Sequence, residues 1–483
     1  MIKTDLFPLR GGLTLALSLV SSAAVFAAET TATQPNIIFV ISDDQRYDAF
    51  GAAGAPGIHT PHLDRLSREG VYFREATIHI PQCSPSRAAL LTGLAAHANG
   101  RYSNQSIRAD INNPNGFDQS ETTPKALKRA GYATNFVGKW HLPPDPWLMG
   151  FDKIGTWMPA GSGKFKGARL AEGATRETRV NEGFVQEEFG KSARKFIREH
   201  ADAGSTQPLF LWLAFTAPHS PYDPNPDSAA DHYEGKTIED VIPTKATYEG
   251  NLVGRPTKKW VEYAAAITSV DDEVGRLLKT LDETGLSSNT VLVFIGDNGY
   301  MMGSHGRNGK AVPYEASIRV PFIIWGPEVF AAQGKTDAVA SSLDLPPTFL
   351  KLAGAEPPSQ WHGRDLTPVL ADGKAHDITW SVSQYPDPKS WKFPGNTYRT
   401  VRTKDSKLIV WHKYTGKGRE FYDIAADPFE QKNLYSDPAY QAKVKELESH
   451  LEHWQARTGD PGDGDLKGPI LRNMGKGGEN SGE

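Results

Sequence analysis

Three strongly apolar segments and one further expected strand, each followed closely by polar side chains, set the tightest limit on how this chain can fold. The apolar segments are residues 36–41, 209–215 and 291–295, the further strand is residues 132–137, and the polar residues after the four strands are Asp43, Asp44, Lys139, His141, His219, Asp297 and Asn298. Uninterrupted apolar runs of this length are typical of strands buried on both faces of a parallel sheet. Ligands bind at the carboxyl edge of such sheets, so we expect these scattered polar residues to gather at one site.

Helical patterns alternate with these segments, which indicates an α/β fold with helices on both faces of the sheet. We expect helices at 61–69, 184–200, 260–281 and 347–352, after Cys83 and from residue 123, further strands at 71–78 and 320–325, and long loops at 143–180 and 220–257. After about residue 370 the pattern changes to short strands at 379–382, 398–402 and 407–411 and a helix at 440–454. The prediction is a main domain of residues 34–370, a small C-terminal α+β subdomain of residues 371–459 with an antiparallel sheet, and a disordered tail of residues 460–483.

Residues 1–27 have the pattern of a secretory signal peptide. Lys3 and Arg10 provide the positive start, residues 13–20 most of the apolar segment, and residues 25–27 a cleavage site. The alternative is a membrane anchor, but the apolar run is shorter than the ~20 residues that a spanning helix needs. We therefore expect a mature chain without a membrane span, exported to the periplasm or secreted. Its formal net charge of -4 offers no basic field for nucleic acid.

Cys83 is the only cysteine of the chain, so no internal disulfide can form. By itself, a lone cysteine fits a small buried apolar residue. Here it begins the stretch Cys83-Ser84-Pro85-Ser86-Arg87, which continues as Ala88-Ala89-Leu90-Leu91-Thr92-Gly93. The apolar run and the glycine behind it predict a short helix with Cys83 at its N-terminus, where negative charge is favoured.

This stretch resembles the signature of the type I sulfatases, Cys-x-Pro-Ser-Arg followed by x-x-Leu-Leu-Thr-Gly, at every fixed position. The resemblance implies an alkaline phosphatase-like fold, in which helices sandwich a large mixed, mostly parallel sheet. It also implies that a formylglycine-generating maturation enzyme oxidises Cys83 to Cα-formylglycine (3-oxoalanine), whose hydrate is the nucleophile. Residues 421–424 (Phe-Tyr-Asp-Ile) and 427–430 (Asp-Pro-Phe-Glu) extend the resemblance into the C-terminal subdomain.

The first group of candidate site residues, Asp43, Asp44, Asp297 and Asn298, offers three carboxylates and one amide oxygen. Hard oxygen ligands of this kind suit Ca²⁺ or Mg²⁺ better than Zn²⁺. Taken singly, each pair also fits a solvated turn or a helix cap. The sulfatase resemblance places one Ca²⁺ ion at these four residues, and an oxygen of the modified residue 83 completes the ligand set.

The second group contains cations and histidines, namely Arg87, Lys139, Lys310, His141 and His219. Considered alone, Lys139 fits a surface lysine and His219 a turn histidine, although a histidine also suits proton transfer near neutral pH. The resemblance assigns Lys139 and Lys310 to sulfate oxygens. It assigns His141 to a hydroxyl of the aldehyde hydrate and His219 to the leaving oxygen. Arg87 matches the residue that holds the modified side chain, and Asp297 is a possible base.

The main hypothesis is a calcium-dependent sulfatase that hydrolyses a sulfate ester of a carbohydrate or polysaccharide. A phosphonate or phosphate monoester hydrolase of the same superfamily is the near alternative. A non-catalytic Ca²⁺-dependent binder of sulfated glycans is a second alternative, but a binder needs no proton-transfer histidines. Several aromatic residues in the loops and the subdomain could stack on sugar rings or pack the protein interior, namely Trp147, Trp157, Tyr222, Tyr385, Trp391 and Tyr398.

Overall fold

The fold is described from a computed structural model, which describes residues 34–104, 106–108, 121–242, 259–386, 397–462 and 470–472. The expected signal peptide, residues 1–27, lies outside the described residues, as do Trp391 and most of the expected C-terminal tail. Within the described residues, no helix is long and apolar enough to cross a membrane.

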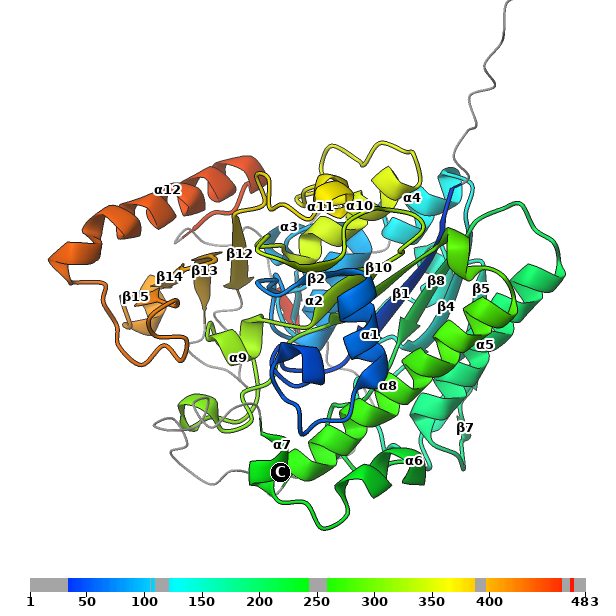
Figure 1. The fold of residues 1–483 in the computed structure, drawn as a ribbon. Coiled ribbons are helices and arrows are strands. Elements are labelled where there is room, and N and C mark those ends of the chain that lie inside the picture. Colours follow the sequence, from blue (N-terminus) through cyan, green and yellow to red (C-terminus); the bar gives the residue numbers. More distant parts are fainter. Residues whose placement is uncertain are drawn as a thin grey trace, which may run out of the picture. The chain divides into compact units, whose positions relative to one another are not determined.

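A large mixed sheet forms the centre of the protein (Figure 1). Its strands, in the order β11-β2-β10-β9-β1-β8-β4-β5-β6-β7, are Gly334–Thr336, Val71–Phe73, Phe322–Trp325, Thr290–Gly296, Asn36–Ser42, Leu209–Ala214, Ala133–Lys139, Lys153–Met158, Arg169–Glu172 and Arg179–Val180. The five neighbours from β9 to β5 run parallel, and antiparallel pairs occur toward the two edges. The α/β prediction with a mostly parallel sheet is therefore confirmed.

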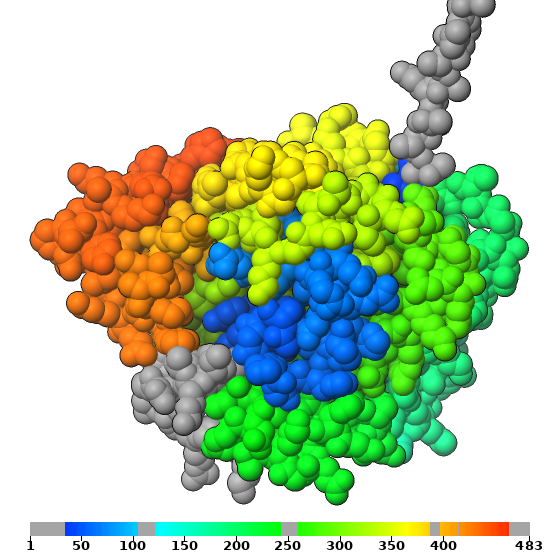
Figure 2. All heavy atoms as spheres, in the orientation of Figure 1, coloured from blue at the N-terminus to red at the C-terminus, as the bar shows by residue number. Residues whose placement is uncertain are grey.

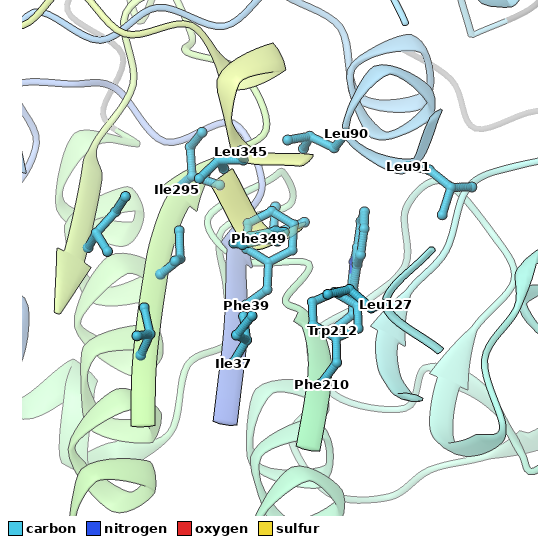
Figure 3. Close-up of a cluster of buried hydrophobic side chains, with 14 of the residues drawn as sticks. Ile37, Phe39, Leu90, Leu91, Leu127, Phe210, Trp212, Ile295, Leu345 and Phe349 are labelled. Atoms are coloured by element: carbon cyan, nitrogen blue, oxygen red, sulfur yellow. The ribbon is translucent and has the colours of Figure 1, made fainter. Parts of the chain in front are cut away.

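Helices cover both faces of this sheet because the side chains of a strand alternate between the faces. Ile37 and Phe39 of β1 belong to a core with the helices α2 (Cys83–Thr92), α4 (Thr123–Arg129), α10 (Leu345–Leu352) and α11 (Thr367–Asp372). Figure 3 shows this core, with Leu90 of α2 and Phe349 of α10 beside the central strands. On the other face, β1 residues such as Val40 pack against α1 (Pro61–Glu69), α5 (Val185–Asp202) and α8 (Trp260–Glu283).

The structure differs from the sequence predictions mainly outside the central strands. The strand expected at 71–78 ends at Phe73, and the loop expected at 143–180 contains β5, β6 and β7. These are short strands at or near the edge of the sheet, and β6 and β7 lack the apolar run that identifies a central strand. The loop expected at 220–257 holds the short helices α6 (Asp227–Ala230) and α7 (Ile238–Val241), and residues 243–258 lie outside the described part.

The C-terminal segments form a second, antiparallel sheet, as the sequence predicts. Its strands, in the order β12-β13-β14-β15, are Trp380–Tyr385, Tyr398–Thr403, Ser406–Trp411 and Arg419–Asp423. The helix α12 (Gln441–Thr458) packs on one face, where Val401 and Leu447 share a core with Ala89 of α2. These segments, orange to red, gather on one side of the view in Figures 1 and 2. A further short pair joins β16 (Ile470–Arg472) to β3 (Ser106–Arg108), so part of the expected tail is a strand.

Candidate active site

Four neighbouring parallel strands, β9, β1, β8 and β4, deliver their C-terminal residues to one place. In the register of β1 and β9, Ser42 lies opposite Gly296, so Asp43 and Asp297 follow side by side. The backbone continues this pairing, because the Asp297 N–H donates to the Ser42 carbonyl at 2.9 Å. Lys139 is the last residue of β4. The expectation that the polar strand ends meet at one edge is therefore confirmed.

The helix α2 brings Cys83 to the same edge. Its first residue is Cys83, the residue before it is extended, and Gly93 ends it in the left-handed conformation with φ 65°. The Cys83 thiol is almost fully buried and lies 3.4 Å from Asp43 Oδ1. Lys310 Nζ lies 2.7 Å from the Cys83 sulfur, and the Ala311 N–H donates to the Pro81 carbonyl at 3.0 Å. The loop that carries Lys310 is thus tied to the segment that precedes Cys83.

Three carboxylates and the thiol form a tight cluster. Oxygens of Asp43, Asp44 and Asp297 and the sulfur of Cys83 all lie within 4.8 Å of one another, and all four side chains are buried. The Asn298 amide nitrogen donates to Asp44 Oδ1 at 2.6 Å, while the buried Asn298 Oδ1 has no hydrogen-bond partner among the described residues. Carboxylates with an unsatisfied amide oxygen fit a hard divalent cation such as Ca²⁺.

Three cations face these three carboxylates. Lys139 forms an ion pair with Asp43, and Lys310 forms one with Asp44. Arg87 Nη2 lies 2.8 Å from Asp297 Oδ2, and Arg87 Nη1 donates to the Lys139 carbonyl at 2.8 Å. These candidate residues therefore lie in one cluster. The formal charges of these six buried side chains cancel. A divalent cation held here would therefore leave a positive excess, which suits an anionic ester.

Burial and neighbouring charges together set the ionisation of the cluster. Burial raises the pKa of the Cys83 thiol to about 12, and the Asp43 charge adds to this effect. A cysteine in this state is a neutral thiol at pH 7 and a poor nucleophile. Burial and the Asp43 charge raise the pKa of Asp297 to about 6. Burial alone would raise the pKa of Asp43, but Lys139, His219 and the other cations outweigh it and lower that pKa.

The two candidate histidines lie at the rim of the cluster. His219 follows β8, and its Nε2 lies 3.7 Å from Asp44 Oδ2, while Nδ1 lies 2.8 Å from the Ser220 carbonyl oxygen. Burial lowers the pKa of His219 despite the Asp44 charge. His141 has a φ of 59°, and its buried Nδ1 has no partner among the described residues. Burial, followed by the charge of Lys139, lowers the pKa of His141 well below its usual range.

Gly161 is a site residue that sequence reasoning missed. A Cβ atom at this position would overlap the imidazole ring of His141, so only glycine leaves the ring its place. We expect Gly161→Ala to displace His141 and to lower kcat for ester hydrolysis by about tenfold to a hundredfold, since a misplacement of ~1 Å can cost that much. Gly183→Ala is the matched control, because a Cβ there meets only an ordinary contact. Unchanged kcat in the Gly161 variant would show that the ring position does not matter.

The aromatic candidates mostly pack the interior. Trp157, Tyr385 and Tyr398 are fully buried and Tyr222 nearly so, which excludes stacking on a sugar in this conformation. Trp147 is half-buried and packs edge-on against Trp157. Sequence reasoning also missed Arg101, whose Nε donates to Ser84 Oγ at 2.8 Å beside Cys83. A single arginine after an Asn-Gly turn carries no periodic signal that could have identified it.

Comparisons with known proteins agree with this geometry. The sulfatase family profile matches residues 35–355, and a profile described as N-sulphoglucosamine sulphohydrolase, C-terminal, matches residues 303–457. The chain belongs to the sulfatase family. As a member of this family it is a sulfuric ester hydrolase, and the predicted relationship is confirmed.

Relatives of this sulfatase match it over most of their length. An N-acetylglucosamine-6-O-sulfatase of Bacteroides thetaiotaomicron is 30% identical, covering 94% of this chain and 92% of that protein. An ulvan-active sulfatase of Formosa agariphila is 28% identical, covering 89% and 82%. A solved structure in complex with its substrate D-glucosamine-2-N,6-O-disulfate superimposes with a TM-score of 0.73 at 28% identity, covering 89% of this sulfatase and 99% of that chain.

Proposed function

We propose that this sulfatase hydrolyses a sulfate ester of a carbohydrate through a nucleophile made from Cys83 and with one bound Ca²⁺ ion. The observation that carries the proposal is the buried cluster of three carboxylates and three cations around the first residue of α2. The names of the relatives, which include an amino-sugar sulfatase and an ulvan-active sulfatase, support a sulfated sugar as the substrate class.

Two groups absent from the chain as translated complete the proposed site. Asp43, Asp44, Asp297 and Asn298, with an oxygen of the modified residue 83, would hold the Ca²⁺ ion, which neutralises charge at the sulfate and favours an ionised nucleophile. Conversion of Cys83 to formylglycine by a maturation enzyme supplies a hydroxyl nucleophile in place of the thiol. The raised pKa of the thiol makes an unmodified Cys83 a poor nucleophile near pH 7, so the proposed reaction needs a different nucleophile at this position.

The protein's own side chains then divide the remaining work. Lys139 and Lys310 donate hydrogen bonds to the sulfate oxygens and stabilise the charge that develops there. Arg87 holds Asp297 and the backbone of Lys139 in place, so that both face residue 83. His219 donates a proton to the departing sugar oxygen, and His141 takes a proton from a hydroxyl at residue 83. Asp297, with its pKa raised to about 6, is a candidate to accept the other hydroxyl proton.

The domain and localisation predictions remain part of this proposal. We propose that residues 34–370 form the catalytic domain and residues 371–459 a subdomain, with residues 460–483 as a tail. The contact between the Ser383 hydroxyl and the Ile78 carbonyl, at 2.6 Å, supports a subdomain that buttresses the segment leading to Cys83. Residues 1–27 would direct export to the periplasm or the outside, where sulfated polysaccharides are accessible.

His219→Ala should separate substrates by their leaving group. If His219 protonates the departing oxygen, its loss lowers kcat by about 10²- to 10⁴-fold for a sugar sulfate, whose alkoxide is a poor leaving group. With 4-nitrophenyl sulfate, whose phenolate needs no proton, we expect a loss of less than about tenfold. Initial rates on the two substrates measure the difference. Equal losses on both would contradict the role as a general acid.

The proposed function is tested by sulfate release from a panel of sulfated sugars and polysaccharides, with protein co-expressed with a formylglycine-generating enzyme. Release from one or a few members supports the proposal and names the substrate. Matched 4-nitrophenyl sulfate, phosphate and phosphonate esters test the near alternative, since a faster phosphonate or phosphate reaction would overturn the assignment. Binding of the panel without any hydrolysis, with residue 83 shown to be cysteine by peptide mass, would favour the non-catalytic binder.

A further inference from the structure

Arg101 is a buried guanidinium without a counterion among the residues that the structure describes. The residue comes shortly after the helix α3 (Ala96–Asn99) in the sequence, and only 4% of it is exposed. Nε donates to Ser84 Oγ at 2.8 Å and Nη2 to the Asn104 carbonyl at 2.6 Å, while the buried Nη1 has no hydrogen-bond partner in the described part of the chain. No described carboxylate forms an ion pair with it. Four other buried arginines each pair with a carboxylate, namely Arg46 with Asp48, Arg87 with Asp297, Arg399 with Asp460 and Arg402 with Glu315.

A purely structural role explains this arrangement poorly. A buried charge without a partner costs several kcal/mol, so an arginine is a poor choice for holding a loop. Asn104 is already fixed by its own hydrogen bonds, because its N–H donates to Gln82 Oε1 at 2.9 Å and its Oδ1 accepts from the Ser84 N–H at 3.1 Å. The cation is therefore not needed to hold residues 101–104 against the start of α2.

The position of Arg101 places its charge beside the catalytic cluster and outside it. Ser84, its hydrogen-bond partner, is the neighbour of Cys83 in the first turn of α2. After burial and Lys139, the Arg101 charge also lowers the pKa of His141, so the two side chains lie within electrostatic range of each other. Burial alone lowers the pKa of Arg101 to about 10, and no carboxylate of the cluster offsets this, which leaves a cation at neutral pH.

Arg101 is closed to solvent in this conformation, and so is the proposed reaction centre, because Cys83 is 1% exposed and Lys139 is fully buried. The proposal requires that the opening which admits a sulfate ester to residue 83 also reaches Arg101. A ligand at this point meets the two N–H donors of Nη1, and guanidinium groups bind carboxylates and sulfates through such charge-assisted hydrogen bonds.

We propose that Arg101 binds a second anionic group of the substrate, a carboxylate or a further sulfate, on the sugar that carries the cleaved ester. The inference rests on the proposed sulfatase function and narrows its substrate class to sugars with at least two anionic groups. A sugar with only one anion leaves the buried Nη1 unpaired, and a site with an unsatisfied buried donor discriminates strongly against such a substrate.

The test compares three probes on the matured enzyme. N-acetylglucosamine 6-sulfate carries one anion, glucosamine 2-N,6-O-disulfate carries a second sulfate, and a disaccharide of a uronic acid with N-acetylglucosamine 6-sulfate carries a carboxylate. We expect the wild-type enzyme to favour one two-anion probe by about tenfold or more in kcat/KM, and the favoured probe identifies the second anion. No preference for either two-anion probe overturns the inference.

Arg101→Met should remove this preference. On the favoured probe we expect kcat/KM to fall by about 30-fold or more, mainly through KM, against less than about threefold on the one-anion probe. Arg65→Met, which removes a partly exposed cation of α1 that pairs with Glu69, is the control and should change neither value. Equal losses on both kinds of probe, or a lower Tm with the preference retained, would assign Arg101 a structural role instead. If Arg101→Met does not fold, Arg101→Lys decides, because losing the planar group should weaken only the two-anion probe.

Binding measurements distinguish failure of this inference from failure of the proposed function. Calorimetric titration of the Cys83→Ala protein gives Kd for each probe without turnover. If no probe releases sulfate, the proposed function fails, but tighter binding of a two-anion probe that depends on Arg101 still supports the subsite. If sulfate is released and Kd does not depend on Arg101, the function stands and the subsite is overturned.

Discussion

Cys83→Ala should abolish sulfate release, with an expected loss in kcat of about 10⁵-fold or more, as is typical when a covalent nucleophile is removed. The physical reason is that the cations and carboxylates around residue 83 stabilise charge but cannot attack sulfur. Lys139 and Lys310 would remain to bind the ester, so KM should change far less than kcat. Initial rates on the best sugar sulfate of the panel measure the effect.

The controls for this prediction address folding and maturation. The Cys83 side chain is small and buried, so the alanine variant should unfold cooperatively close to the wild-type Tm. Ser67→Ala, a buried substitution of similar size on α1, should leave kcat unchanged. The wild-type peptide that contains residue 83 should carry an aldehyde by mass spectrometry. A Cys83→Ala protein that keeps even a tenth of the wild-type rate would rule out residue 83 as the nucleophile.

Removal of Ca²⁺ should affect both activity and stability. Dialysis against EGTA is expected to lower sulfate release by about 100-fold or more and to lower Tm, and added Ca²⁺ should restore both. The ion would bind the folded protein only, because chain folding brings Asp43 and Asp297 together, and a ligand at 100 times its Kd stabilises by about 2.7 kcal/mol. Thermal unfolding with and without Ca²⁺ measures this without relying on activity.

Asn298→Ala sharpens the calcium prediction. It removes the amide oxygen, which has no hydrogen-bond partner among the described residues, and keeps the three carboxylates, although Asp44 loses the hydrogen bond from the amide nitrogen. We expect the Ca²⁺ concentration for half-maximal restoration to rise by about tenfold to a hundredfold, as one oxygen ligand is lost. Asp337→Asn, at an exposed ion pair with Arg74, is the control and should not shift it. Full activity after EGTA with no Ca²⁺-dependent change in Tm would contradict a calcium site.

Local pattern was sufficient for the central strands and for the edge at which they meet. Helices cover both sides of β1, so the strand from Asn36 to Ser42 has apolar side chains on both faces. A strand buried in this way can be recognised from its residue types alone. The same reasoning failed for β6 and β7, which are short, partly exposed strands that pair antiparallel with their neighbours along the chain. Strands this short and exposed contain no apolar run by which they could be identified.

The candidate site was predictable to a similar extent. The sequence alone predicted that Asp43 and Asp297 belong to one site, because parallel strands end at a common edge and each residue follows an apolar run. Only the family resemblance identified Lys310 as a site residue, because it lies in a loop after β9. Its Nζ contacts the Cys83 sulfur, and a hydrogen bond from the Ala311 N–H to the Pro81 carbonyl ties the loop to the segment before Cys83. Neither Gly161 nor Arg101 could be identified before the chain was folded, since the importance of each depends on a neighbour distant in sequence.

The sequence by itself therefore determined the α/β architecture, the position of the site at the carboxyl edge and the chemical types gathered there. Hydrophobic periodicity and strand ends depend on residues that are close together in the sequence, so the sequence alone is enough to identify them. The tertiary structure alone decided the charge balance around residue 83, the neutral state of its thiol and the unpaired cation at Arg101. These depend on burial and on distances between side chains, because the cost of a charge is set by the solvent and the partners that folding removes or supplies.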